Sequence, residues 1–297
     1  NGTVAVVSLG GKDLPHPRTS ELVAPRALGA SDADLDGLID RRVAFANWLT
    51  QPDNEFFAKA IANRIWAHYL GRGLVEPVDD IRETNPATNE PLMNALSRHM
   101  IDVEFDMQAF TRTLLKSRVY QLSSKSNDSN RDDQQNFSHA AYKAIPAEAL
   151  LDAISQTTGV AEKFNGWPEG YRAIQIWDNR MPSYFFRIFG RPVRATVCEC
   201  ERSGEPSISQ ALHLLNSPEI MAKIQHRDGT ARRLANSELT DDELIDELYL
   251  TTLSRFPNEE ERNLMREAFS DSGSERNEAV EDVLWALLNT KEFIFNH

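Results

Sequence analysis

Four aspartates near the start of the chain have the spacing of a loop that could bind a hard cation. Carboxylates at alternate positions converge on one ion, and Gly37 permits the sharp turn that such a loop needs. The pattern matches the start of an EF-hand-type loop, but the twelfth position is Val43 instead of the bidentate glutamate. The alternative is the acidic start of a helix, because carboxylates favour the positive end of the helix dipole. The candidate calcium ligands are Asp32, Asp34, Asp36 and Asp40.

The two cysteines of the chain, Cys198 and Cys200, are separated only by Glu199, which excludes a disulfide scaffold. Two thiols at this spacing could form half of a soft-metal site, a redox pair or a strained disulfide. A zinc site would need two further ligands, for which His213 and Glu205 are candidates. The alternative is two small buried thiols, because free cysteines are usually buried and neighbouring carboxylates make a thiol less reactive.

Residues 159–205 combine many glycines and prolines with large aromatic side chains. The glycines and prolines favour an irregular segment. A polar loop does not usually contain so many aromatic rings, so we expect the segment to pack against helices. Within it, Trp177 is followed by Asp178 and then by Arg180. Rings beside such polar groups suit a carbohydrate platform, and they equally suit a plug that covers helix ends. The aromatic residues are Trp167, Tyr171, Trp177, Tyr184, Phe185, Phe186 and Phe189.

Arg64 and His68 lie one turn apart on the clearest predicted helix. They could contact a ligand together. Alternatively, they satisfy helix-end carbonyls or nearby carboxylates such as Asp79 and Asp80.

Apolar residues at helical spacing, bounded by capping residues, predict about nine helices and no convincing series of strands. The predicted fold class is therefore mainly α, an irregular multi-helix domain. The clearest helix begins at Asp53 or Asn54 and ends before Gly71, where a glycine suits the left-handed conformation. The predicted helices cover residues 41–50, 54–70, 89–100, 106–119, 146–158, 207–215, 240–253, 258–269 and 275–289.

Local signals also predict helix starts and inward faces. Thr240 with Glu243 has the spacing of a capping box, and Asn258 with Glu261 repeats it. Ser207 is the predicted cap of the helix over 207–215. The face of that helix expected to be buried carries Ile208, Ala211, Leu212 and Leu215.

The chain reads as an extended lead-in over residues 1–30, which could complete an upstream domain, followed by one helical domain. A polar stretch over 122–138 is expected to be a loop. The two-lobe alternative divides the rest at this loop. The corresponding ranges are 31–297 for a single domain, or 31–121 and 140–297 for two lobes.

Charge and missing motifs exclude several classes of function. The formal charge of −13 disfavours nucleic-acid binding, and no apolar run is long enough for a membrane span. No C-x-x-C-H motif is present, so we expect no covalent haem, and no cofactor other than calcium is indicated. Common metallohydrolase and nucleotide-binding motifs are also absent. The missing motifs leave an enzymatic function open, because catalytic triads assemble from residues that are distant in the sequence.

Several phrases of the sequence together resemble a planctomycete-specific domain of unknown function, from about residue 20 to the C-terminus. This domain typically forms the C-terminal part of large exported proteins that also carry planctomycete-type cytochrome c domains. The phrases include ANRIW at 62–66, GRGLV at 71–75, SRVYQLS at 117–123, FGRP at 189–192, CECERS at 198–203, QALHLLNS at 210–217 and NTKEFIFNH at 289–297.

The resemblance implies an extracytoplasmic location, periplasmic or at the cell surface, and domains of the same parent chain or a cytochrome c module as partners. The first hypothesis is a scaffold or binding module of a redox or polysaccharide-processing protein, with polysaccharide as a further partner. The alternative is a carbohydrate- or redox-active enzyme. Its site would involve Arg64, His68, Trp177, Asp178, Arg180, Cys198 and Cys200.

Overall fold

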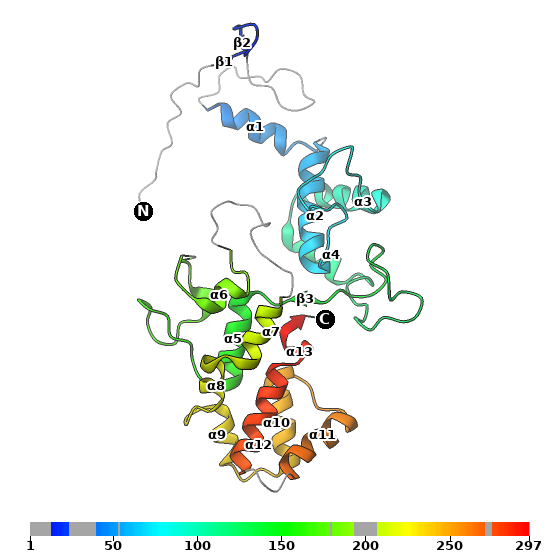
Figure 1. The fold of residues 1–297 in the computed structure, drawn as a ribbon. Coiled ribbons are helices and arrows are strands. Elements are labelled where there is room, and N and C mark those ends of the chain that lie inside the picture. The colour runs from blue at the N-terminus through cyan, green and yellow to red at the C-terminus, as the bar shows by residue number, and fades with distance from the viewer. Residues whose placement is uncertain are drawn as a thin grey trace. The chain divides into compact units, whose positions relative to one another are not determined.

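A computed structural model of the chain has a mainly α fold, as the sequence predicts (Figure 1). The structure describes residues 13–23, 40–52, 54–178, 180–192, 207–270 and 275–296. These residues contain thirteen α-helices, and their strands are only two residues long. By its internal contacts the chain divides into two compact units, Asn1–Ala141 and Tyr142–His297. We refer to them as unit 1 and unit 2.

Unit 1 combines a small hairpin with four helices. Strands β1 and β2 pair antiparallel, with Leu14 opposite Val23. The described elements are β1 (Leu14–Pro15), β2 (Leu22–Val23), α1 (Arg41–Leu49), α2 (Glu55–Leu70), α3 (Glu90–Asp102) and α4 (Met107–Leu115).

Helix α2 has the ends that the sequence predicts. The Asn54 side chain accepts hydrogen bonds from the first-turn amides of Phe56 and Phe57, and Gly71 adopts the left-handed conformation with φ 83°. The buried residues of α2 include Ala58, Ala62 and Trp66, and the helix packs against α3. Ala62 and Trp66 belong to the same hydrophobic core as the buried residues of α3.

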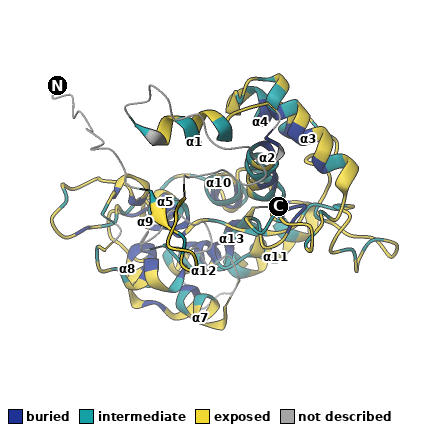
Figure 2. Cartoon of the chain, turned by 90° about the horizontal axis from the view of Figure 1, so that it is seen from above, coloured by how far each residue is buried: buried dark blue, intermediate teal, exposed yellow. Residues whose placement is uncertain are grey.

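The core of unit 1 lies where α2, α3 and α4 meet. The α3 helix buries Met93, Leu96 and Met100, and α4 adds Phe110 and Leu114. In Figure 2 the α3 ribbon accordingly changes between dark blue and yellow along its length. These helices are amphipathic, so burial of one face is what fixes them in place.

A fully buried asparagine on α2 organises the loop after this helix. The Asn63 amide nitrogen donates to the carbonyls of Val75 and Val78, at 3.0 and 2.9 Å. Its carbonyl oxygen accepts from the amides of Leu74 and Val75, at 2.8 and 3.1 Å. A Cβ on Gly73 would lie 2.5 Å from the Val75 carbonyl oxygen, so a larger residue does not fit there. The ANRIW and GRGLV phrases therefore build one packed turn.

The polar stretch over 122–138 forms turns without a helix or strand. Asp133 accepts hydrogen bonds from Ser138, Asn136 and Gln135, and these hydrogen bonds hold the pKa of its carboxyl well below its usual range. The Phe137 ring packs edge-on against Trp66 at 5.2 Å, which attaches the loop to the core of unit 1.

Unit 2 contains the remaining helices and one short strand pair, with Lys143 opposite Asn296. Its elements are β3 (Lys143–Ala144), α5 (Ala147–Thr158), the 3-10 turn η1 (Ala173–Gln175), α6 (Tyr184–Ile188), α7 (Ile208–Asn216), α8 (Pro218–Ile224), α9 (Thr230–Ala235), α10 (Asp241–Leu253), α11 (Glu259–Ser270), α12 (Arg276–Leu288), α13 (Lys291–Ile294) and β4 (Phe295–Asn296).

The core of unit 2 is built around α12, which contacts α8, α9, α10, α11 and α13. Its buried residues include Val280, Val283 and Leu284, and α10 contributes the fully buried Leu244 and Leu248. Such a helix, apolar on more than one side, lies at the centre of its unit.

The predicted capping signals of unit 2 are confirmed. Ser207 and Thr240 each form a reciprocal capping box with the residue three positions later. Asn258 and Glu261 exchange the same pair of hydrogen bonds before α11.

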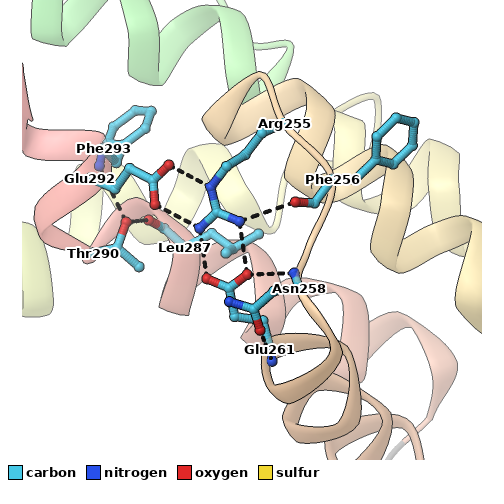
Figure 3. Close-up of polar contacts among 8 residues, drawn as sticks. All are labelled: Arg255, Phe256, Asn258, Glu261, Leu287, Thr290, Glu292 and Phe293. Atoms are coloured by element: carbon cyan, nitrogen blue, oxygen red, sulfur yellow. Dashed lines mark hydrogen bonds and ion pairs between the residues drawn. The ribbon is translucent and has the colours of Figure 1, made fainter. Parts of the chain in front are cut away.

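Arg255 follows α10 and joins three elements through ion pairs (Figure 3). Its guanidinium donates to both carboxylate oxygens of Glu261 on α11, at 2.6 and 2.8 Å, and of Glu292 on α13, at 2.6 and 2.7 Å. It also lies 5.5 Å from the ring centre of Tyr249. Hydrogen bonding to the two carboxylates raises the pKa of Arg255 above its ordinary value. We call these side chains the Arg255 cluster.

Within the described residues, no helix is both long enough and apolar enough to cross a membrane.

Candidate functional site

The irregular segment over 159–192 divides into a buried and an exposed set of aromatic rings. Phe164, Phe185, Phe186 and Phe189 belong to the core of unit 2. Trp177, by contrast, is 80% exposed. The segment therefore has some of its rings in the core and Trp177 at the surface, and the carbohydrate platform stays a prediction.

Three of the remaining rings form a cluster at the surface, which we call the aromatic platform: Trp167, Tyr171 and Trp177. The Trp167 ring is partly buried against the core, and the Trp177 ring meets it edge-on at 5.8 Å. Tyr171 lies 5.3 Å from Trp167 and is tilted by 48°. Trp167, which packs against the core, thus contacts a tryptophan that is mostly exposed to solvent.

The backbone beneath the platform is attached to α5 by one carboxylate. Asp152 accepts hydrogen bonds from the amides of Ala173 and Ile174 in η1, at 2.6 and 3.2 Å, and Arg172 lies 3.4 Å from the same carboxylate. These contacts hold the backbone of η1, which lies between Tyr171 and Trp177 in the chain, against α5.

The polar residues predicted beside Trp177 shape the next turn. The Asp178 carboxylate accepts from the amide of Arg180 at 2.9 Å, which is a local turn contact. Asp178 is half-buried and Arg180 is exposed. Both residues lie close to Trp177 in the chain.

A pocket with a volume of about 200 Å³ lies in the same unit, and we call it the His213 pocket. Residues from α5, α7, α8 and the irregular segment line it. One wall is apolar, with Leu151, Ile154 and Phe164 among its residues. The polar lining residues include Glu162, Lys163, Asn165, Ser183, His213, Glu219 and Lys223.

His213 is packed among three aromatic rings, and its Nε2 is buried without a hydrogen-bond partner in the described part of the chain. The rings of Tyr184, Phe185 and Phe189 lie 5.4, 5.7 and 6.1 Å from the imidazole. Burial lowers the pKa of His213, and the charge of Glu219 acts in the opposite direction.

The ammonium group of Lys223, in contrast, has its partners within the protein. It lies 2.9 Å from the Val160 carbonyl, 3.3 Å from the Glu162 carboxylate and 3.5 Å from the Ser155 hydroxyl. Three contacts match the three donors of an ammonium. Lys223 thus secures the pocket wall, while His213 retains an unused polar atom.

A buried ion pair supports the floor of the irregular segment. Arg191 lies 3.4 Å from the Glu148 carboxylate and 4.4 Å from the centre of the Phe186 ring. Both charged side chains are almost fully buried, so we interpret them as positioning residues that hold the FGRP phrase against α5.

The other predicted site residues lie in unit 1 or outside the described residues. Arg64 donates to both carboxylate oxygens of Asp79, at 2.6 and 2.8 Å, while His68 is exposed in the last turn of α2. Arg64 therefore makes the carboxylate contact that was the alternative to ligand binding. Trp177, Asp178 and Arg180 belong to unit 2, so a site shared with Arg64 and His68 stays a prediction.

Asp40 caps α1 by accepting from the Arg42 amide, and its carboxylate forms an ion pair with the Arg42 guanidinium. Hydrogen bonds from Arg42 lower the pKa of Asp40. No group of three possible metal ligands occurs among the residues that the structure describes. Cys198, Cys200, Asp32, Asp34 and Asp36 lie outside the described residues, as does Asn179.

Of the polar residues that line the His213 pocket, the sequence analysis named only His213, and it did so as a candidate zinc ligand beside the cysteines. The inward face predicted for α7 is wrong. Ile208 and Leu212 are 80% and 53% exposed, whereas Leu214 is buried. The capping box instead turns Gln210 toward α6, where its amide donates to the Ile188 carbonyl at 3.1 Å. The one available signal was the histidine within the apolar QALHLLNS phrase.

A model of the family described as PSD1, protein of unknown function (DUF1553), matches residues 41–269. The match includes the aromatic platform and the His213 pocket, and it ends before α12, although α12 lies in the core of unit 2. Neither a curated protein nor a solved structure matches the chain.

Proposed function

The chain belongs to the DUF1553 family of proteins of unknown function, and we propose that it is a saccharide-binding module. The observation that carries this proposal is the 80% exposure of Trp177 beside the anchored Trp167. Large aromatic residues are usually buried, so a nearly fully exposed tryptophan on a fixed support suits a binding surface.

The chemistry of the platform suits sugars. One face of a sugar ring presents C–H groups that stack on an indole, and its edge presents hydroxyls that need polar partners. Asp178 and Arg180 stand next to Trp177 in the chain, and Lys163 forms a 3.8 Å ion pair with Glu169 two residues after Trp167. Nucleic-acid bases also stack on aromatic rings, but the net charge of −13 opposes a phosphate backbone.

We place this module outside the cytoplasm, in a parent chain with a cytochrome c domain, because the resemblance of its sequence phrases implies such a setting. A role as scaffold or binding domain of a polysaccharide-processing protein agrees with a saccharide-binding surface. Detection of the parent chain in the periplasmic or surface fraction would test the location.

The proposal is tested by isothermal titration calorimetry of the full chain against a panel of neutral and sulfated oligosaccharides. We expect at least one oligosaccharide to bind. Trp177→Ala should weaken that binding about tenfold, because a lost stacking contact is worth roughly 1 kcal/mol or more.

The control is Phe256→Ala, which removes another exposed ring of unit 2 away from the platform. It should leave the affinity unchanged, and both variants should keep the melting temperature of the wild type. Oligosaccharide binding that survives Trp177→Ala undiminished, or no binding by any member of the panel, would overturn the proposal.

A further inference from the structure

Helix α7 carries a set of exposed apolar side chains, which we call the α7 apolar face. Ile208 is 80% exposed, Leu212 is 53% exposed and Leu215 is 39% exposed. Ala211, which lies between them in the sequence, is exposed as well. These positions are spaced i, i+3, i+4 and i+7, so the four side chains adjoin one another on one side of the helix. Helices that dock on a partner protein present their apolar side chains at this spacing.

Hydrogen bonds hold α7 against the rest of unit 2. The Gln210 amide donates to the Ile188 carbonyl at 3.1 Å, and the Trp285 indole donates to the Leu215 carbonyl at 3.3 Å. Leu214, on another side of the helix, is buried in the core of the unit. The contacts of α7 within unit 2 therefore leave the apolar face on the outside of that unit.

The composition of α7 is also unusual in its charge. Among the thirteen α-helices that the structure describes, it is the one without an aspartate, glutamate, lysine or arginine. The stretch from Ser207 to Pro218 contains none either, although such residues make up 26% of the whole chain. The side of a helix that meets water is normally polar or charged. The α7 apolar face instead has the composition of a surface that another apolar surface covers.

A second copy of the chain is the occupant that the charges favour. Each copy carries a net charge of −13, and like charges placed against each other across an interface oppose association. Because α7 has no charged side chain, two copies can meet there without such a juxtaposition. A two-fold symmetric interface joins the same patch of both subunits, and an apolar patch is complementary to itself.

The positions of the side chains suit a crossed pair of α7 helices. Ala211 lies in the middle of the apolar face, and its small side chain allows the two helix axes to approach to about 8–10 Å. Ile208 and Leu215 then lie on either side of the crossing point. A helix of nine residues is about 14 Å long, so α7 alone buries less than the roughly 800 Å² per partner of a standard interface. The expected dimer is therefore weak and reversible.

From these observations we infer that the α7 apolar face is a self-association surface, through which two copies of this chain form a two-fold symmetric dimer. The inference goes beyond the proposed function and does not rest on it, because no residue of the aromatic platform belongs to α7.

Sedimentation velocity of the full chain, from low micromolar to several hundred micromolar, tests the inference. We expect the sedimentation coefficient to rise with concentration toward that of a dimer. Ile208→Glu and Leu212→Glu each place a carboxylate at an exposed position, so both variants should keep the wild-type melting temperature and stay monomeric throughout. The control is Leu264→Glu, which adds the same charge at a 60% exposed leucine of α11 and should leave the dimer intact.

Salt separates an apolar contact from one that depends on ion pairs. Added salt screens the repulsion between two chains of charge −13 but does not weaken apolar burial. We expect the dissociation constant of the dimer to fall several-fold as sodium chloride is raised. A dissociation constant that rises with salt would contradict the inference.

Cysteine crosslinking locates the contact. In a background of Cys198→Ser and Cys200→Ser, Ala211→Cys should give a disulfide-linked dimer when oxygen and copper are supplied as oxidant. Residues at the centre of a two-fold contact face their own counterparts at distances that a disulfide can span. Leu264→Cys in the same background is the control and should crosslink far less.

Three results would overturn the inference. The first is a chain that stays monomeric at every concentration. The second is a dimer that survives both Ile208→Glu and Leu212→Glu. The third is crosslinking through Leu264→Cys that equals crosslinking through Ala211→Cys.

Discussion

The Arg255 cluster and the His213 pocket are two polar regions of the same unit that differ in how far their polar atoms are hydrogen-bonded. Arg255 donates to two carboxylates and a carbonyl, and Asn258 completes the bonding of Glu261 (Figure 3). His213 keeps a buried nitrogen without a partner among the described residues. Natural proteins satisfy most buried polar groups, and His213 shares this feature with buried polar atoms of Trp66, His139, Thr252 and Asn277.

The same contrast extends to unit 1, where the buried Asn63 uses its amide fully within the protein. We therefore expect the saturated polar groups to contribute stability and the unsatisfied nitrogen of His213 to contribute little. The substitutions below test that division, from the largest effect on stability to the smallest.

Asn63→Leu should cause the largest loss, about 3 kcal/mol of unfolding free energy, because four backbone groups lose their partner at once. The measurement is urea denaturation of the full chain. Asn94→Leu, at an exposed position of α3, is the control and should change the free energy by less than about 0.5 kcal/mol. A small loss for Asn63→Leu would show that water replaces these hydrogen bonds.

Arg255→Met should cost about 1–3 kcal/mol, between the values for exposed and buried ion pairs, because it leaves Glu261 and Glu292 facing each other without a cation. The control is Arg266→Met, which breaks an exposed pair with Asp242 on the neighbouring helices. Its melting temperature should stay near that of the wild type. Equal effects of the two substitutions would contradict a special role for the cluster.

Acid should weaken the Arg255 cluster in a defined direction. Hydrogen bonding from Arg255 holds the pKa of Glu261 below its ordinary value of 4.5. This contribution to stability is complete above the unfolded-state pKa and is lost as the pH falls through the lower folded-state pKa. The melting temperature should therefore decrease as the pH is lowered below about 4.5.

Thermal denaturation between about pH 7 and pH 3 checks this expectation. Glu261→Gln should show a shallower fall than the wild type, whereas Glu260→Gln, at an exposed position of the same helix, should show the wild-type slope. Identical slopes for all three proteins would refute the assignment to Glu261.

His213→Phe should change stability least, by less than about 1 kcal/mol in either direction, because it removes an unsatisfied nitrogen and keeps the ring packing. The comparison is His99→Phe, which loses the 3.0 Å contact between Nε2 and the Thr113 hydroxyl while keeping the stack on Phe110. His99→Phe should be the more destabilising of the two. The reverse order would indicate that His213 has a structural partner.

The helix ends could be predicted because capping depends on residues only a few positions apart. Asn54, Gly71 and the boxes at Thr240 and Asn258 act where the sequence placed them. The short helices α6, α9 and α13 were not predicted, since six or fewer residues show no helical period.

The candidate site was only partly predictable. Trp177 could be found because an aromatic among glycines and prolines is unusual, but its exposure depends on how Trp167 packs. The pocket joins α5, α7, α8 and the irregular segment, so its composition depends on tertiary packing alone. The α7 helix shows why, since periodicity favoured Ile208, Ala211, Leu212 and Leu215, whereas the one buried residue of the helix is Leu214.

The central claim is that Trp177, exposed beside the core-packed Trp167, is a stacking surface for a sugar ring. The most direct measurement is the ¹⁵N NMR signal of the tryptophan indoles during titration of the full chain with the oligosaccharide that binds. We expect the Trp177 resonance to shift in proportion to occupancy and the resonance of the buried Trp66 to stay constant. A Trp177 resonance that does not move while the oligosaccharide saturates the protein would contradict the claim.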